Sequence, residues 1–135
     1  MAKLKKQHMT IHWKAIVQDD SSIPATEATL KEKATLVGRI GLMMLSVGTG
    51  AWRVRNSMNK VARCLGITCT ADIGLLAISY TCIEGTDTYT QSISNPTTGV
   101  NTHKLMQLEL FMKEFPDKVS TYSVKHIHEV LDEIQ

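Results

Sequence analysis

The sequence has no apolar run long enough to cross a bilayer, which needs about 20 residues. Its two most apolar stretches, residues 36–47 and 73–83, are short, and Arg39 interrupts the first. A secretory signal is also missing, because polar residues follow the basic start where an apolar segment and a cleavage site would be needed. We therefore expect a chain that is itself soluble.

The sequence is poor in cysteine and nearly neutral in charge. Its three cysteines, Cys64, Cys69 and Cys82, have no Cys-x-x-Cys spacing, which fits a reducing compartment and small buried side chains. The net charge of +2 at pH 7 is too small to indicate nucleic-acid binding by itself. We expect no nucleic-acid partner.

Short motifs of common enzymes and cofactor sites are absent as well. The sequence has no phosphate-loop or dinucleotide fingerprint and no Gly-x-Ser-x-Gly elbow. His126 and His128 are two residues apart, which on a helix points them to different sides and does not favour a shared metal ion. We predict no catalytic residue, no metal and no cofactor. A small hydrolase-like enzyme that uses Thr-rich strands and His103 remains an alternative.

The sequence does contain patterns typical of the helices and strands of a single domain, and its 135 residues are the length of one domain. We expect a partly flexible N-terminal arm over residues 1–25 and the domain over residues 26–135. The first helix should run from a cap at Thr26 to residue 47, and its two apolar faces predict that it lies between layers. Gly38 and Gly41 would let a neighbouring element approach it closely.

A second helix follows the corner Gly48-Thr49-Gly50 and ends at Gly66. Three strands are predicted over residues 67–72, 75–84 and 86–94, joined as an antiparallel meander whose last strand lies at an edge. Two further helices are expected over residues 101–115, from a cap at Asn101 to a stop at Pro116, and over 123–134, capped by Ser123. The fold class is α+β, with the order ααβββαα and the helices on one face of one antiparallel, about three-stranded sheet.

The corner before the second helix is the candidate binding site. Gly48 and Gly50 can expose backbone N–H groups at a helix N-terminus, where anions are favoured, and Arg53 and Arg55 stand in the first turn. A guanidinium can hold a carboxylate through two parallel hydrogen bonds, so Arg53 is the candidate for the carboxylate of an amino acid. Two alternatives remain: the corner is purely structural, or Arg53 pairs with an acidic residue of the last helix, such as Glu129 or Glu133.

The same stretch resembles a known family. The matching pattern consists of Gly48, the triplet Trp52-Arg53-Val54, Met58, Asn59, Lys60, the pair Val61-Ala62, Gly66, and then Asn101, Lys104 and Leu105. Over residues 36–134, this pattern is similar to the N-terminal domain of the threonine/serine exporter family.

The resemblance implies an inner-membrane transporter of amino acids whose N-terminal part lies in the cytoplasm. The chain would be a soluble domain on the cytoplasmic side of the cell membrane, with a gating, regulatory or assembly role. Its partners would be membrane-spanning helices of the same transporter or of a partner subunit, with threonine or serine as a possible ligand. A homo-oligomerisation module remains another alternative, since the helix over residues 26–47 and the strand over 86–94 could each meet a second copy.

Overall fold

The computed structural model describes residues 23–74, 77–94 and 102–134. Nearly all of the predicted N-terminal arm and the predicted cap Asn101 lie outside the described residues. The elements are η1 (Ala25–Glu27), α3 (Leu30–Ser46), α4 (Ala51–Cys64), β1 (Thr68–Ile73), β2 (Ala77–Glu84), β3 (Asp87–Ser94), α5 (Thr102–Lys118) and α6 (Val124–Ile134). This order confirms the α+β class and the sequence ααβββαα.

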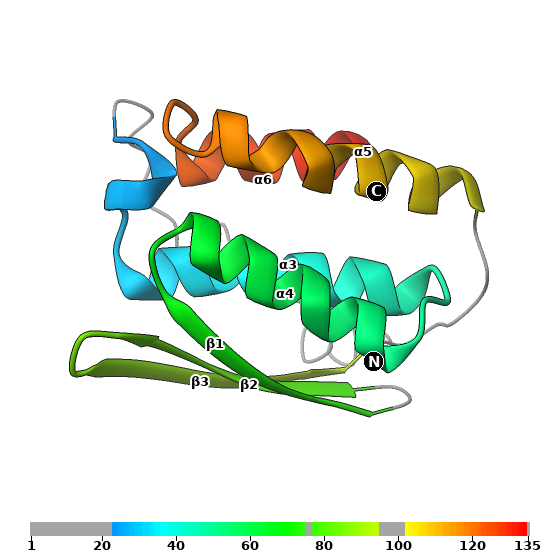
Figure 1. Cartoon of the computed structure of the whole chain (residues 1–135), viewed down its shortest axis with the longest axis horizontal. Helices are drawn as coiled ribbons and strands as arrows, with labels where there is room; N and C mark the ends of the chain where they lie inside the picture. Colours follow the sequence, from blue (N-terminus) through cyan, green and yellow to red (C-terminus); the bar gives the residue numbers. More distant parts are fainter. Residues whose placement is uncertain (1–22, 75–76, 95–101, 135) are drawn as a thin grey trace, which may run out of the picture.

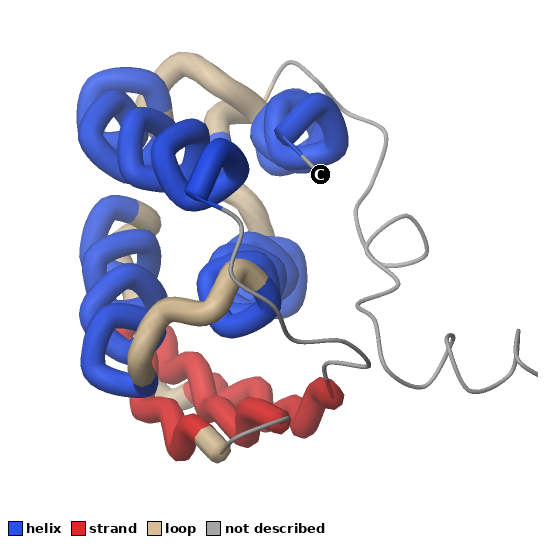
Figure 2. Tube along the Cα trace, turned by 90° about the vertical axis from the view of Figure 1, so that its right-hand side faces the viewer, coloured by secondary structure: helices blue, strands red, loops and turns tan. Residues whose placement is uncertain are grey.

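The elements form three layers (Figure 1). The sheet is one outer layer, α3 and α4 form the middle layer, and α5 and α6 form the other outer layer, as the nearly end-on view of the helices in Figure 2 also shows. Helix α3 contacts β2, β3 and α6, whereas α4 contacts β1 and α5. The helices therefore cover one face of the sheet, as predicted, but in two tiers.

The sheet is the predicted antiparallel meander, in the order β1-β2-β3. Gly85 joins β2 to β3 with a φ of 62°, a left-handed conformation that favours glycine. One face buries Ile78, Tyr80 and other side chains against the middle layer. The opposite face carries hydroxyl groups, including a Ser79–Ser92 contact of 2.9 Å between hydroxyl oxygens. This division into a buried and a wet face is typical of antiparallel sheets.

Helix α3 is the interior helix that its two apolar faces predicted. Almost every residue from Glu32 to Leu45 is buried. A Cβ atom on Gly38 would lie 2.2 Å from the hydroxyl of Tyr80, and one on Gly41 would lie 2.5 Å from the sulfur of Met58. Both glycines therefore allow the close approach that the sequence predicted. Because α3 is largely enclosed by its own fold, only Lys31 is exposed and Leu30, Leu42 and Ser46 are partly exposed on it.

The predicted start of the first helix was wrong by three residues. The Thr29 hydroxyl, and not that of Thr26, accepts the N–H of Glu32, at 3.3 Å. Thr26 lies in the short helix η1, which is fixed because the Ala25 N–H donates to the Tyr122 carbonyl at 2.7 Å. The chain must leave this attachment in an extended conformation before α3 can begin.

The predicted stop at Pro116 was also wrong, since α5 continues to Lys118 with Pro116 inside it. Proline removes its own N–H from the helix and its ring crowds the carbonyl four residues earlier, but its neighbours can still form hydrogen bonds. The Val119 N–H reaches the Phe115 carbonyl at 3.0 Å, and both side chains are buried. Their packing holds the last turn. At the start of α6, the Ser123 hydroxyl accepts the His126 N–H at 3.1 Å, which confirms the predicted cap.

The contact between α3 and the sheet predicts the effect of Gly38→Ala. The added methyl group would overlap the Tyr80 ring and displace its hydroxyl from the Ala34 carbonyl, which accepts it at 2.9 Å. We expect the free energy of unfolding to fall by about 1–3 kcal/mol, measured by urea denaturation. Gly50→Ser is the control, because a Cβ there meets nothing within 4 Å, its φ of −69° suits any residue, and serine is favoured at the start of a helix. Equal stability of both variants would contradict the tight contact at Gly38.

Candidate functional site

The glycine corner, residues 48–50, lies between the end of helix α3 and the start of helix α4. Gly48 has a φ of 90°, so this position favours glycine. The N–H groups of Gly48 and Thr49 donate to the last carbonyls of α3, those of Leu45 and Met44. Gly50 is the N-cap of α4 in an ordinary extended conformation, without a side-chain cap. Gly48 therefore needs the conformational freedom of glycine, whereas Gly50 does not.

Arg53 has an acidic partner, but not the one that the sequence suggested. Its guanidinium lies 3.2 Å from the carboxylate of Glu109 on α5, and each side chain is about half exposed. The prediction of a partner on the last helix, Glu129 or Glu133, was wrong because α4 packs against α5, while α6 packs over α3. Exposed ion pairs of this kind contribute at most about 1 kcal/mol.

A groove opens between α4 and α5 around this ion pair. It has a volume of about 310 Å³, at the lower end of the range of ligand sites. Its lining combines apolar, polar and charged side chains: Met44, Trp52, Arg53, Asn56, Ser57, Lys60, Glu109, Met112 and Lys113. We call it the α4–α5 groove. Of the predicted anion-binding residues only Arg53 lines it, whereas Gly48, Gly50 and Arg55 do not.

Of the motif positions of the sequence, some lie in the core, some at this groove and others elsewhere on the helices. Met58 is fully buried against α3, and Trp52 is 70% exposed at the groove. Asn59 lies half-buried on α4, and its side-chain oxygen has no hydrogen-bond partner among the described residues. Lys104 lies half-buried on α5, and the hydrolase candidate His103 lies exposed beside it. These four positions and His103 do not form one cluster.

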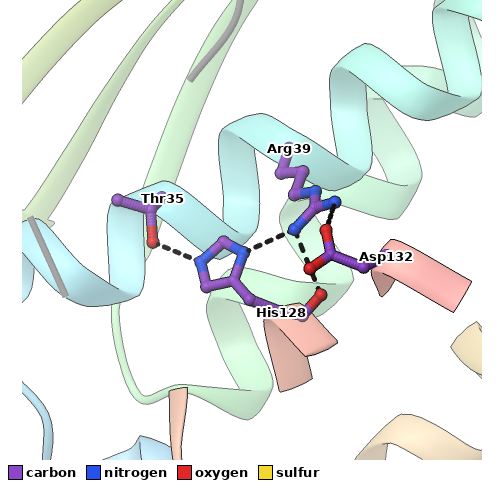
Figure 3. A network of polar contacts seen from close by, with 4 residues as sticks. All are labelled: Thr35, Arg39, His128 and Asp132. Carbon is purple, nitrogen blue, oxygen red and sulfur yellow. Dashed lines mark hydrogen bonds and ion pairs between the residues drawn. The ribbon is translucent and has the colours of Figure 1, made fainter. Parts of the chain in front are cut away.

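Sequence reasoning missed a buried polar network between α3 and α6 (Figure 3). The Arg39 guanidinium donates to Nδ1 of His128 and to its carbonyl oxygen, both at 3.1 Å, and forms an ion pair with Asp132. Because Nδ1 accepts, Nε2 carries the proton and donates to the Thr35 hydroxyl at 2.8 Å. That hydroxyl donates in turn to the Glu32 carbonyl at 2.6 Å. The chain of hydrogen bonds is consistent with a neutral imidazole.

Burial is the main reason why the His128 ring is neutral. Loss of hydration, followed by the positive charge of Arg39, lowers the pKa of His128 from 6.5 to about 3. A sequence signal for this network existed in the i,i+4 spacing of two polar pairs, Thr35 with Arg39 and His128 with Asp132. Each pair lies on one face of its helix, but only packing places the two faces together.

A model of the threonine/serine exporter family matches residues 35–135. The chain belongs to this family. Searches of curated proteins and of solved structures give no match. Among the described residues, no helix has the length and apolar character needed to span a membrane, and no group of three or more His, Cys, Asp or Glu side chains could hold a metal ion.

The threonine/serine exporter match includes both features described above. It begins at Thr35, so it contains the Arg39–His128 network as well as the α4–α5 groove. Membership places the chain in amino-acid transport and in the context of a membrane transporter. The matched range agrees closely with residues 36–134, over which the sequence resembles the family.

The buried imidazole predicts how stability depends on pH. Below pH 6.5 the unfolded chain binds a proton at His128 that the folded chain does not bind until about pH 3. The free energy of unfolding should therefore fall as the pH decreases through this interval, with a contribution from His128 of up to about 1.4 kcal/mol per pH unit. In His128→Gln, whose amide can still donate to Thr35, this contribution should disappear. Urea denaturation at several pH values between 7.5 and 4 measures the slopes.

The exposed His126 on the same helix provides the matched control. His126→Gln should keep the slope of the unmodified chain. Parallel curves for the unmodified chain and His128→Gln would contradict a neutral, buried His128.

Proposed function

We propose that this chain is the cytoplasmic domain of a threonine/serine exporter-like transporter and that it gates or regulates transport, or assembles with the membrane-spanning part. Its partners are membrane-spanning helices of the same transporter or of a partner subunit. It acts without a metal or cofactor and is not an enzyme. The family match and the α4–α5 groove support this proposal, and the Arg53–Glu109 pair in the groove is the observation that carries it.

The groove offers both charges that a free amino acid requires. An α-amino acid carries a carboxylate and an ammonium group, which Arg53 and Glu109 can bind respectively. Ser57 and Asn56 line the same groove and can hydrogen-bond the hydroxyl group of threonine or serine. Because the Arg53–Glu109 pair is half exposed, separating the two side chains costs little free energy. The carboxylate of a ligand can then take the place of Glu109 at Arg53, and its ammonium group can take the place of Arg53 at Glu109.

The position of the groove suggests how binding could be transmitted. Arg53 belongs to the middle layer and Glu109 to the outer layer of helices, so a ligand between them would change the contact of the two layers. The other seam between these layers, α3 with α6, contains the buried Arg39–His128 network, whose disruption would leave uncompensated polar groups. When a ligand binds, movement of α5 relative to α4 should therefore require less free energy than movement of α6 relative to α3. A ligand that binds better to one arrangement would shift the population towards it.

Amino-acid binding predicts a measurable heat in isothermal titration. We expect threonine and serine to bind the purified chain with a Kd on the order of millimolar. Arg53→Ala should weaken this binding about tenfold or more, because a charge-assisted hydrogen bond to the carboxylate contributes about 1.5–3 kcal/mol.

Arg55→Ala is the matched control, since Arg55 lies two residues away on α4, is exposed and does not line the groove. It should bind as the unmodified chain does. Absence of heat at millimolar threonine and serine would remove the ligand-sensing role and leave assembly as the proposed role. Equal losses in both variants would show a general effect of charge.

The proposed membrane partner makes a prediction about the gene. The reading frame that contains this chain, or a neighbouring one, should encode several apolar segments of about 20 residues. Their product should co-purify with the chain from detergent-solubilised membranes. A locus without any such segment would contradict the proposed role in a transporter.

A further inference from the structure

Two of the three cysteines face each other across the sheet. Cys69 on β1 and Cys82 on β2 are register partners. Both side chains are buried towards the helix layer, whereas their neighbours Thr68 and Thr70 are exposed. The two thiols therefore lie on the same face of the sheet, directly opposite one another.

The hydrogen-bond pattern of the two strands shows that Cys69 and Cys82 form a non-hydrogen-bonded pair, the kind with the shorter Cα–Cα distance. In antiparallel sheets, hydrogen-bonded pairs alternate with non-hydrogen-bonded pairs, whose Cα atoms are only about 4.5 Å apart. At the end of the ladder the Gly74 N–H donates to the Ala77 carbonyl at 2.8 Å, so these two residues form a hydrogen-bonded pair. Counting back along β1, Cys69 and Cys82 form a non-hydrogen-bonded pair. A disulfide requires Cα atoms about 4.4–6.8 Å apart, which such a pair satisfies.

Cys69 can be reached from solvent along a second groove, which we call the α4–β1 groove. This groove has a volume of about 750 Å³, and Cys69 lies in its wall. Lys60 and Arg63 also line it, and none of its described lining residues is acidic. Such a surface attracts anions. Cys82, in contrast, has no exposed surface and does not line this groove.

We propose that Cys69 and Cys82 are a dithiol site that exchanges with an anionic low-molecular-weight disulfide and closes into a cross-strand disulfide. The Cys69 thiolate attacks the small disulfide, forms a mixed disulfide and releases one thiolate, which takes up a proton. Cys82 then loses its proton and attacks the Cys69 sulfur, which releases the second small thiol. The two cysteines lose two electrons, and the small disulfide gains them.

The environment assigns different roles to the two thiols. The Cys82 thiol donates a hydrogen bond to the Cys69 sulfur, which lowers the pKa of Cys69, while burial acts in the opposite direction. The same hydrogen bond, together with burial, raises the pKa of Cys82. Cys69 is therefore the attacking group and Cys82 the resolving group. Arg53 and Glu109 do not line the α4–β1 groove, although Asn56 and Lys60 line both grooves. The test detects disulfide formation, so it is read independently of amino-acid binding.

The test uses the full chain with Cys64→Ser, which removes the third thiol. The folded protein is treated with oxidised glutathione, blocked with N-ethylmaleimide, digested and analysed by mass spectrometry. We expect a peptide pair joined through Cys69 and Cys82 without bound glutathione. Adding Cys82→Ala should trap glutathione on Cys69, and adding Cys69→Ala should abolish the reaction, because the remaining thiol is buried. Maleimide labelling in urea verifies that every retained thiol is reactive once unfolded.

Two results would overturn the proposal. One is the absence of a Cys69–Cys82 disulfide while both thiols react in urea, and the other is equally fast glutathione addition to Cys82 in the Cys69→Ala variant. The charge of the groove is tested with Lys60→Gln/Arg63→Gln. Its reaction with oxidised glutathione should slow about threefold or more relative to the reaction with the cationic disulfide cystamine. An unchanged ratio would overturn the preference for an anionic disulfide.

Discussion

The structure depends on the enclosure of α3, because every buried polar group on this helix must find its partner inside the protein. Lys33 meets Glu84 of the sheet at 2.6 Å, and Arg39 meets His128 and Asp132 of α6. These contacts attach the middle layer to the layers on both sides of it. Removing one partner would leave a buried charge uncompensated, which is far more costly than losing an exposed ion pair.

The middle and outer helix layers are consequently joined by two interfaces of different strength, α3 with α6 and α4 with α5. The α3–α6 interface is buried and polar, and its histidine is held neutral. The α4–α5 interface contains a half-exposed ion pair beside an open groove. In a member of the threonine/serine exporter family, this asymmetry supports a site at which a charged ligand could change the contact of α4 with α5 while α6 stays in place.

The basic helix α4 serves different purposes on its different sides. Its apolar stripe, with Met58 fully buried, packs against α3, while Trp52 and Arg53 face the α4–α5 groove. Farther along the helix, Lys60 and Arg63 line the α4–β1 groove that reaches Cys69. One helix thus connects the proposed amino-acid site with the proposed dithiol site, which have separate chemistry.

The sequence by itself determined the elements and their order, because apolar periodicity and glycine positions report local conformation. It indicated that α3 is interior, that the strands form a meander and that Gly38 and Gly41 allow close contact. It misplaced the ends of two helices, because the Ala25–Tyr122 hydrogen bond and the packing of Phe115 with Val119 are tertiary.

Only the tertiary structure decided which side chains meet. Sequence reasoning offered an acidic partner for Arg53 on the last helix as one alternative. It treated Arg39 as an interruption of an apolar stretch and regarded the cysteines as small buried side chains. Three pairs join residues that are far apart in the chain or that face each other on neighbouring strands. They are Arg53 with Glu109, Arg39 with His128, and Cys69 with Cys82. Local pattern cannot specify these partners, because they depend on which layer each helix joins and on how each strand is aligned.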